Sequence, residues 1–143
     1  MLKYIFIGLT LLISTKSCKV AQHNLNGQDM KETETILSGN WEVTSMEGID
    51  SISKKPTFIF DTENQKISGN AGCNRYGASY VQKDSLVTFT PGFATKMYCG
   101  NMPVEKVFFE NLEKVVSFKI ENEELLFFSS DGLNVMRSSG VNK

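Results

Sequence analysis

Apolar side chains recur at every second position through much of the last hundred residues, and this spacing is typical of β-strands that bury one face. The segments with this pattern, or with a short apolar run, are residues 41–46, 57–60, 86–90, 117–121, 124–129 and 133–137. Glu121-Asn122-Glu123 and Asp131-Gly132 separate the last three segments as turns do. Strands joined by short turns pair as neighbours, so the sequence predicts an antiparallel meander.

One segment has helical spacing instead. Its apolar residues are Val104, Val107, Phe108, Leu112 and Val115, and we assign Glu105, Lys106, Glu110, Glu113 and Lys114 to the opposite face. Asn101 is a candidate N-cap and Pro103 fits a first turn. The helix should lie across one face or end of the sheet with Phe108 buried. The predicted fold class is therefore mostly β (β-rich α+β): a single small antiparallel, barrel-like sheet, open or irregular, with one amphipathic helix.

The N-terminus has the layout of a signal peptide. Its apolar run of about ten residues is roughly half the length of a membrane-spanning helix. Thr15-Lys16-Ser17-Cys18 then resembles a bacterial lipobox. Ordinary signal-peptidase cleavage and a buried first helix are the alternatives. We expect residues 1–17 to be removed, Cys18 to carry a lipid, residues 18–35 to form a flexible tether and residues 36–143 to form one domain.

Charge and histidine content exclude several function classes. The chain has 15 basic and 16 acidic side chains, and removal of residues 1–17 takes away two lysines, so the mature protein is mildly acidic. Nucleic-acid binding and polybasic membrane patches need clusters of Lys and Arg, which are absent. The single histidine, His23, lies in the tether, so we expect no metal, no cofactor and no histidine-dependent catalysis. A carboxylate pair from Asp61, Glu63 and Asp84 stays open.

The most unusual segment, residues 67–80, is rich in glycine and carries Cys73, and Cys99 follows in residues 94–99. Glycine permits positive φ or close approach of another backbone. No Gly-Lys-Ser or Gly-Lys-Thr follows and no helix begins directly after the segment, so it is not a phosphate-binding loop.

In these blocks the chain resembles the META domain family, the domain of HslJ-like bacterial envelope proteins. The resemblance rests on Gly72-Cys73-Asn74-Arg75-Tyr76 and Thr95-x-Met97-x-Cys99 in this order, and it covers nearly the whole expected domain. It implies a compact barrel-like fold with one helix, often in an exported or lipid-anchored protein. It supplies no reaction.

The cysteine count agrees with that resemblance. A lipid on Cys18 leaves Cys73 and Cys99 as a pair in an exported, oxidising setting, so we predict a disulfide between them. The alternative is a reactive or redox thiol on Cys73, because Arg75 lies near it in sequence.

A disulfide between Cys73 and Cys99 would bring together their sequence neighbours. These neighbours form the candidate recognition patch, which consists of Asn74, Arg75, Tyr76, Lys96 and Tyr98. In the alternative interpretation, Asn74 and Arg75 satisfy backbone groups in a tight strand connection while the tyrosines pack.

The sequence therefore favours a non-enzymatic lipoprotein of the cell envelope, held at the outer membrane or facing the periplasm. Its domain would bind a protein, a peptide or another envelope component, with a role in envelope stress. A carrier of a small hydrophobic ligand inside the barrel is the main alternative. An enzyme that uses carboxylates or the cysteines is the third.

Overall fold

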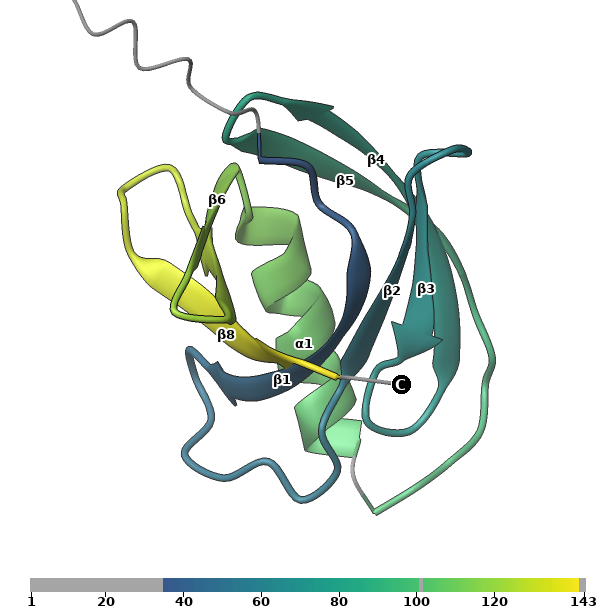
Figure 1. Cartoon of the computed structure of the whole chain (residues 1–143). Helices are drawn as coiled ribbons and strands as arrows, with labels where there is room; N and C mark the ends of the chain where they lie inside the picture. The colour runs from purple at the N-terminus through teal and green to yellow at the C-terminus, as the bar shows by residue number, and fades with distance from the viewer. Residues whose placement is uncertain (1–34, 101, 142–143) are drawn as a thin grey trace, which may run out of the picture. The chain divides into compact units, whose positions relative to one another are not determined.

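The strands of this protein form one ring in the computed structural model, which describes residues 35–100 and 102–141. The elements are β1 (Gly39–Met46), β2 (Thr57–Asp61), β3 (Lys66–Asn70), β4 (Arg75–Lys83), β5 (Leu86–Ala94), α1 (Met102–Lys114), β6 (Ser117–Glu121), β7 (Glu124–Phe128) and β8 (Asn134–Gly140). Each strand pairs with the next, and β8 pairs with β1, so the barrel is closed (Figure 1). The predicted fold class is confirmed, and the irregularity takes the form of bulges and one short seam.

The expected signal peptide, Cys18, His23 and the candidate cap Asn101 lie outside the described residues. Within the described ranges, no helix has both the length and the apolar character that crossing a membrane requires.

A bulge in β1 changes the simple alternation expected from the sequence. The register with β8 shifts between Val43 and Ser45, so Val43 and Met46 are buried whereas Ser45 is exposed. Strict alternation within residues 41–46 predicts Ser45 on the face of Val43, and the structure differs because a bulge inserts one extra residue into the strand. The inserted residue turns Met46 into the core.

The glycine-rich segment forms two strands, β3 and β4, that the sequence pattern did not predict. Gly69 in β3 lies so close to β2 that a Cβ atom there would sit 2.0 Å from the carbonyl oxygen of Thr57. Gly77 in β4 lies under the ring of Phe93, and a Cβ there would be 2.6 Å from Phe93 Cε1. Glycine at both positions therefore allows close contact rather than an unusual φ.

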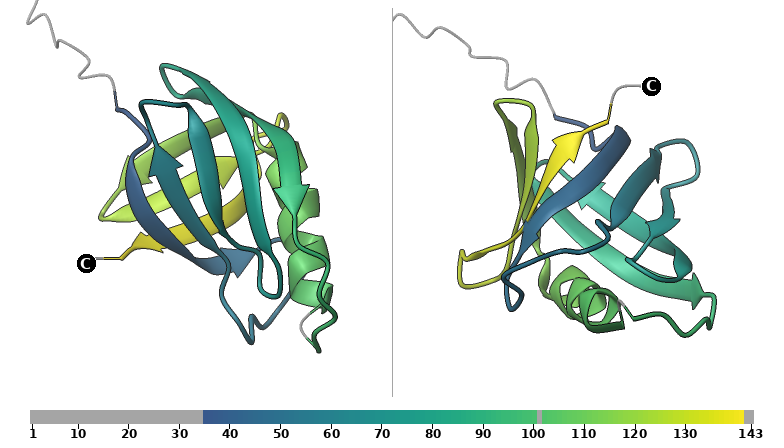
Figure 2. Two further views of the ribbon diagram at one scale, coloured as in Figure 1. Left: turned by 90° about the vertical axis from the view of Figure 1, so that its right-hand side faces the viewer. Right: turned by 90° about the horizontal axis from the view of Figure 1, so that it is seen from below.

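The helix α1 packs beside the weakest pairing in the ring. Strands β5 and β6 share only the Leu86–Ser117 pair, so the C-terminal half of β5 has no strand on its outer edge. In Figure 2, α1 lies alongside this half of β5. Its buried face completes the core, with the Phe108 ring 5.4 Å from Phe58 and 5.2 Å from Tyr76. Burial of Phe108, expected from the helical spacing, is confirmed.

Candidate functional site

The connection between β3 and β4 is a tight turn held by its own side chains. Asn70 donates from Nδ2 to the carbonyl oxygen of Cys73 at 3.2 Å, and its Oδ1 accepts from Gly72 N at 2.8 Å. Gly72 has φ +106°, and a Cβ there would lie 2.9 Å from Val104 Cγ1. Both the conformation and the contact with α1 therefore require glycine at position 72.

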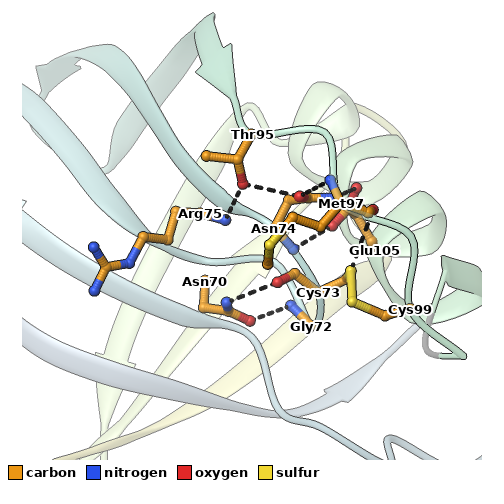
Figure 3. Close-up of a disulfide and its surroundings, with 9 residues drawn as sticks. All are labelled: Asn70, Gly72, Cys73, Asn74, Arg75, Thr95, Met97, Cys99 and Glu105. Carbon is orange, nitrogen blue, oxygen red and sulfur yellow. Dashed lines mark hydrogen bonds between the residues drawn. A yellow bond between two sulfur atoms is a disulfide. The ribbon is translucent and has the colours of Figure 1, made fainter.

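Asn74 ties this turn to two other parts of the chain (Figure 3). Its side chain is 2 % exposed. Its backbone N–H donates to Glu105 Oε2 at 2.7 Å, and its Nδ2 donates to Glu105 Oε1 at 3.0 Å and to the Met97 carbonyl oxygen at 3.1 Å. Its Oδ1 accepts from Met97 N at 2.7 Å and from Thr95 Oγ1 at 2.8 Å. The hydrogen-bonding capacity of the amide is thus filled.

Glu105 is the residue that sequence reasoning misplaced. We had assigned it to the solvent face of the helix, but it is 8 % exposed and binds Asn74 with both carboxylate oxygens. The signal was available, because positions 105, 108 and 112 follow the i, i+3, i+7 spacing of one helix face. Its charge argued for solvent, yet two charge-assisted hydrogen bonds and the positive end of the helix dipole offset the cost of burial.

The predicted disulfide between Cys73 and Cys99 is present, with a Cα–Cα distance of 5.9 Å. Cys73 therefore carries no free thiol, and the redox-thiol alternative has no support in this structure. The bridge at Cys99 and the bonds of Asn74 to Thr95 and Met97 together hold residues 95–100, the loop between β5 and α1, which we call the β5–α1 loop.

The predicted recognition patch divides into a buried half and an exposed half. Asn74 and Tyr76 are buried, and the Tyr76 hydroxyl donates to the Thr57 carbonyl oxygen at 2.9 Å. These two residues match the alternative interpretation, because their polar atoms are used inside the fold. Arg75, Lys96 and Tyr98 are exposed, and Tyr98 is 93 % exposed.

A shallow groove lies on the outer face of the sheet beside Arg75. Ile59, Ser68, Gly77 and Phe93 stand directly opposite one another across β2, β3, β4 and β5. They line a groove of about 490 Å³, which we call the outer groove. Ile59 and Phe93 are 48 % and 70 % exposed, so two apolar side chains flank a floor of small residues.

A second, smaller groove of about 240 Å³ lies between the C-terminal half of β5 and α1. Phe109 and Leu112 of the helix and Ala94 of the strand contribute apolar side chains, with Glu113 at its edge. This groove lies where a strand paired with the C-terminal half of β5 would otherwise be.

The comparisons with known proteins agree on the fold. A model of the META domain matches residues 34–140, which is most of the chain. The chain belongs to the META domain family. No curated protein sequence matches it.

Solved structures resemble this META domain at low sequence identity. A protein from Burkholderia xenovorans, solved by NMR, is 18 % identical with a TM-score of 0.59, over 74 % of this chain and 83 % of that one. A DUF4847 family protein from Bacteroides vulgatus, solved by crystallography, is 14 % identical with a TM-score of 0.51, over 74 % of this chain and 94 % of that one. At this identity the likeness shows a shared fold alone.

The carboxylates considered for catalysis, Asp61, Glu63 and Asp84, are all exposed in this META domain. Hydrogen bonds from the side chain and backbone of Asn64 hold the pKa of Asp61 below its usual value. A general acid needs a raised pKa, so the lowered pKa of Asp61 makes this side chain unsuited to donate a proton. Within the described part of the chain, no group of three or more His, Cys, Asp or Glu side chains could hold a metal ion.

Proposed function

We propose that this chain is an exported, lipid-anchored protein of the cell envelope whose META domain is a non-enzymatic binding module. The N-terminal sequence supports export, and the lipobox-like stretch ending at Cys18 supports the anchor. The disulfide between Cys73 and Cys99 fits an oxidising compartment. HslJ-like envelope proteins carry the same domain, which supports the same location.

The binding proposal rests on the β5–α1 loop, which has a held backbone and exposed side chains. A disulfide and a buried asparagine, itself bonded to the buried Glu105, hold its backbone, while Met97 and Tyr98 are 59 % and 93 % exposed. A loop ordered before binding loses little entropy when a partner arrives, which raises affinity. Tyrosine offers a large contact area with a polar hydroxyl, and it is enriched in binding surfaces for this reason. Lys96 within the loop and Arg75 beside it add exposed positive charge.

The carrier alternative has less support, because aromatic rings fill the barrel interior. Phe58 and Phe89 each lie within 5.6 Å of Phe127 near the barrel centre, measured between ring centroids. Tyr80 lies 5.5 Å from Phe60 in the same way. A ligand chamber of a few hundred cubic ångströms would have to displace these rings. The two apolar grooves lie outside this ring cluster, so contact with a partner fits them better.

A photo-crosslinking experiment in the native envelope tests the binding proposal. A benzophenone amino acid replaces Tyr98 in one variant and Leu133 in the control, because Leu133 is 54 % exposed in the turn before β8. Mass spectrometry should identify a protein that is captured from position 98, not from position 133, and lost when Arg75→Glu and Lys96→Glu are added. Equal capture at both positions, or none, contradicts the proposal.

Mass spectrometry of the mature N-terminus tests the anchor independently. We expect a peptide that begins at Cys18 and carries the added mass of a lipid. An unmodified peptide that continues upstream of Cys18 contradicts the anchor and leaves the binding proposal intact.

A further inference from the structure

We propose that the outer groove binds an extended, acidic peptide segment, with an apolar side chain between Ile59 and Phe93 and a carboxylate on Arg75. This inference rests on the proposed binding function and names the chemistry of the partner. Four features carry it: the shape of the groove, its apolar flanks, the position of Arg75 and the charge around it.

The shape of the groove fits an extended peptide. Ile59 and Phe93 are separated by three strand spacings, or about 14 Å, which four or five extended residues span. Ser68 and Gly77 lie between them and leave the floor low. The Phe93 ring covers Gly77, so a side chain of the partner can rest over Ser68 with the Phe93 ring as one wall and Ile59 as the other.

Arg75 lies beside this floor. It is two residues from Gly77 on the same strand, so its side chain leaves the same face of β4 about 7 Å away. In Figure 3 the Arg75 side chain points away from the disulfide and the Asn74 network. Its backbone is fixed by Thr95, which accepts from Arg75 N through Oγ1 and donates its own N–H to the Arg75 carbonyl oxygen at 2.9 Å. The backbone of Arg75 is therefore held in place, while its guanidinium makes no hydrogen bond or ion pair with the described residues.

The charge around the groove is complementary to an acidic partner. Among the ion pairs of the described residues, none involves Arg75 or Lys96. Asp61, at the other side of the groove, stands directly opposite Lys66, so the two largely offset each other. The groove is therefore locally positive on a protein whose charged side chains are in slight acidic excess. A carboxylate on Arg75 would form a bidentate, charge-assisted pair.

An anionic membrane surface fits these observations less well than a peptide. Binding to acidic lipids generally takes clusters of about four to eight basic residues, whereas the described residues place Lys66 in the groove, opposite Asp61, and Arg75 beside it. The apolar side chains also border a groove on a sheet face instead of forming one protruding tip.

A peptide selection identifies the partner chemistry directly. The full chain, purified in detergent as the cell processes it, is panned against a random dodecapeptide phage library. The most enriched peptide is then synthesised with a fluorescent label, and its affinity is measured by anisotropy. We expect enriched peptides to combine acidic and apolar residues. Arg75→Glu and Phe93→Ala should each weaken binding about tenfold or more, because a charge-assisted pair or a buried ring is lost.

Two matched variants on the same strand serve as controls. Lys83→Glu makes the same charge change as Arg75→Glu, and Val81→Ala truncates another exposed apolar side chain, both at the far end of β4. Each should keep affinity within twofold. A peptide with lysine in place of its acidic residues should prefer Arg75→Glu over the unmodified protein.

Three results would overturn the inference: no enrichment, enriched peptides without acidic residues, or binding that Arg75→Glu leaves unchanged. Vesicle co-sedimentation supplies a fourth, because a preference for phosphatidylglycerol over phosphatidylcholine that Arg75→Glu abolishes would assign the surface to a membrane. If crosslinking at position 98 finds a partner while these assays fail, the acidic-peptide inference is wrong and the proposed function stands. If crosslinking also fails, both are wrong.

Discussion

At the scale of single residues, Asn74 joins three segments that are distant in sequence. Replacing it with alanine removes the side-chain hydrogen bonds to Glu105, Met97 and Thr95, and leaves the buried Glu105 carboxylate with the backbone N–H of residue 74 but without the amide donor. We expect Asn74→Ala to lower the free energy of unfolding by about 2 to 4 kcal/mol, since unpaired buried polar and charged groups keep their desolvation cost. Urea denaturation measures this loss.

Asn64→Ala is the matched control for this prediction. Asn64 also bonds a carboxylate, that of Asp61, but both residues are exposed, Asp61 at the end of β2 and Asn64 in the turn that follows. The control should change the free energy of unfolding by less than about 0.5 kcal/mol. Equal effects of the two substitutions would mean that the Asn74 network does not stabilise the fold.

Because Tyr76 is buried, the free energy of unfolding should depend on pH in the alkaline range. Burial raises the pKa of its phenol far above the ordinary value, and burial also raises the pKa of Tyr80. Because the folded-state pKa is raised, the stabilisation is complete below the unfolded pKa of about 10 and is lost as the pH rises beyond it. Each tyrosine that stays protonated should contribute a slope of about 1.4 kcal/mol per pH unit.

Tyr76→Phe tests this slope. At pH 7 the variant should be less stable by about 1 kcal/mol, because the hydrogen bond to the Thr57 carbonyl oxygen is lost. Above pH 10 its stability should fall less steeply than that of the unmodified protein, so the two curves converge. Urea denaturation from pH 7 to 11.5 gives both curves, and parallel curves would show that Tyr76 ionises normally.

At the scale of elements, contact between β2 and β3 depends on a missing side chain. Gly69→Ala would place a Cβ 2.0 Å from the Thr57 carbonyl oxygen, so one strand must shift. We expect a loss of about 1 to 3 kcal/mol in the free energy of unfolding. Gly100 has no atom within 4 Å of its Cβ position, so Gly100→Ala should leave stability unchanged or slightly raised. Thermal unfolding compares the two, and a stable Gly69→Ala variant would contradict the close contact.

The same elements explain which parts of the fold the sequence could predict. β6 alternates and β7 is a short apolar run, and a short turn separates them, so their positions were predicted to within a residue. β3 and β4 carry glycines where neighbours come close, and glycine contributes nothing to a hydrophobic pattern. The expected disulfide predicted that the two cysteine segments meet. It did not predict which side chains turn inward, because burial of Asn74 and Glu105 depends on partners distant in sequence.

At the scale of the whole molecule, a closed ring of strands is completed by two additions. Strand pairing runs from β1 round to β8, but the seam between β5 and β6 is a single pair. The chain leaves the ring at this seam, through the β5–α1 loop, and α1 packs against the core before β6 resumes the ring. The disulfide joins the β5–α1 loop to the turn between β3 and β4. It therefore connects the segment that leaves the ring after β5 to the other side of β4.

Removing the disulfide should therefore destabilise the whole domain. The bridge closes a segment of 26 residues, which on the chain-entropy model contributes about 3.5 kcal/mol. We expect the double variant Cys73→Ala, Cys99→Ala to lose about this much in urea denaturation, with a larger dependence on urea because its unfolded chain is more expanded. A reductant should shift the unmodified protein towards the variant and leave the variant unchanged. Coinciding midpoints for the oxidised protein and the variant would mean that the Asn74 network holds the β5–α1 loop without the covalent bond.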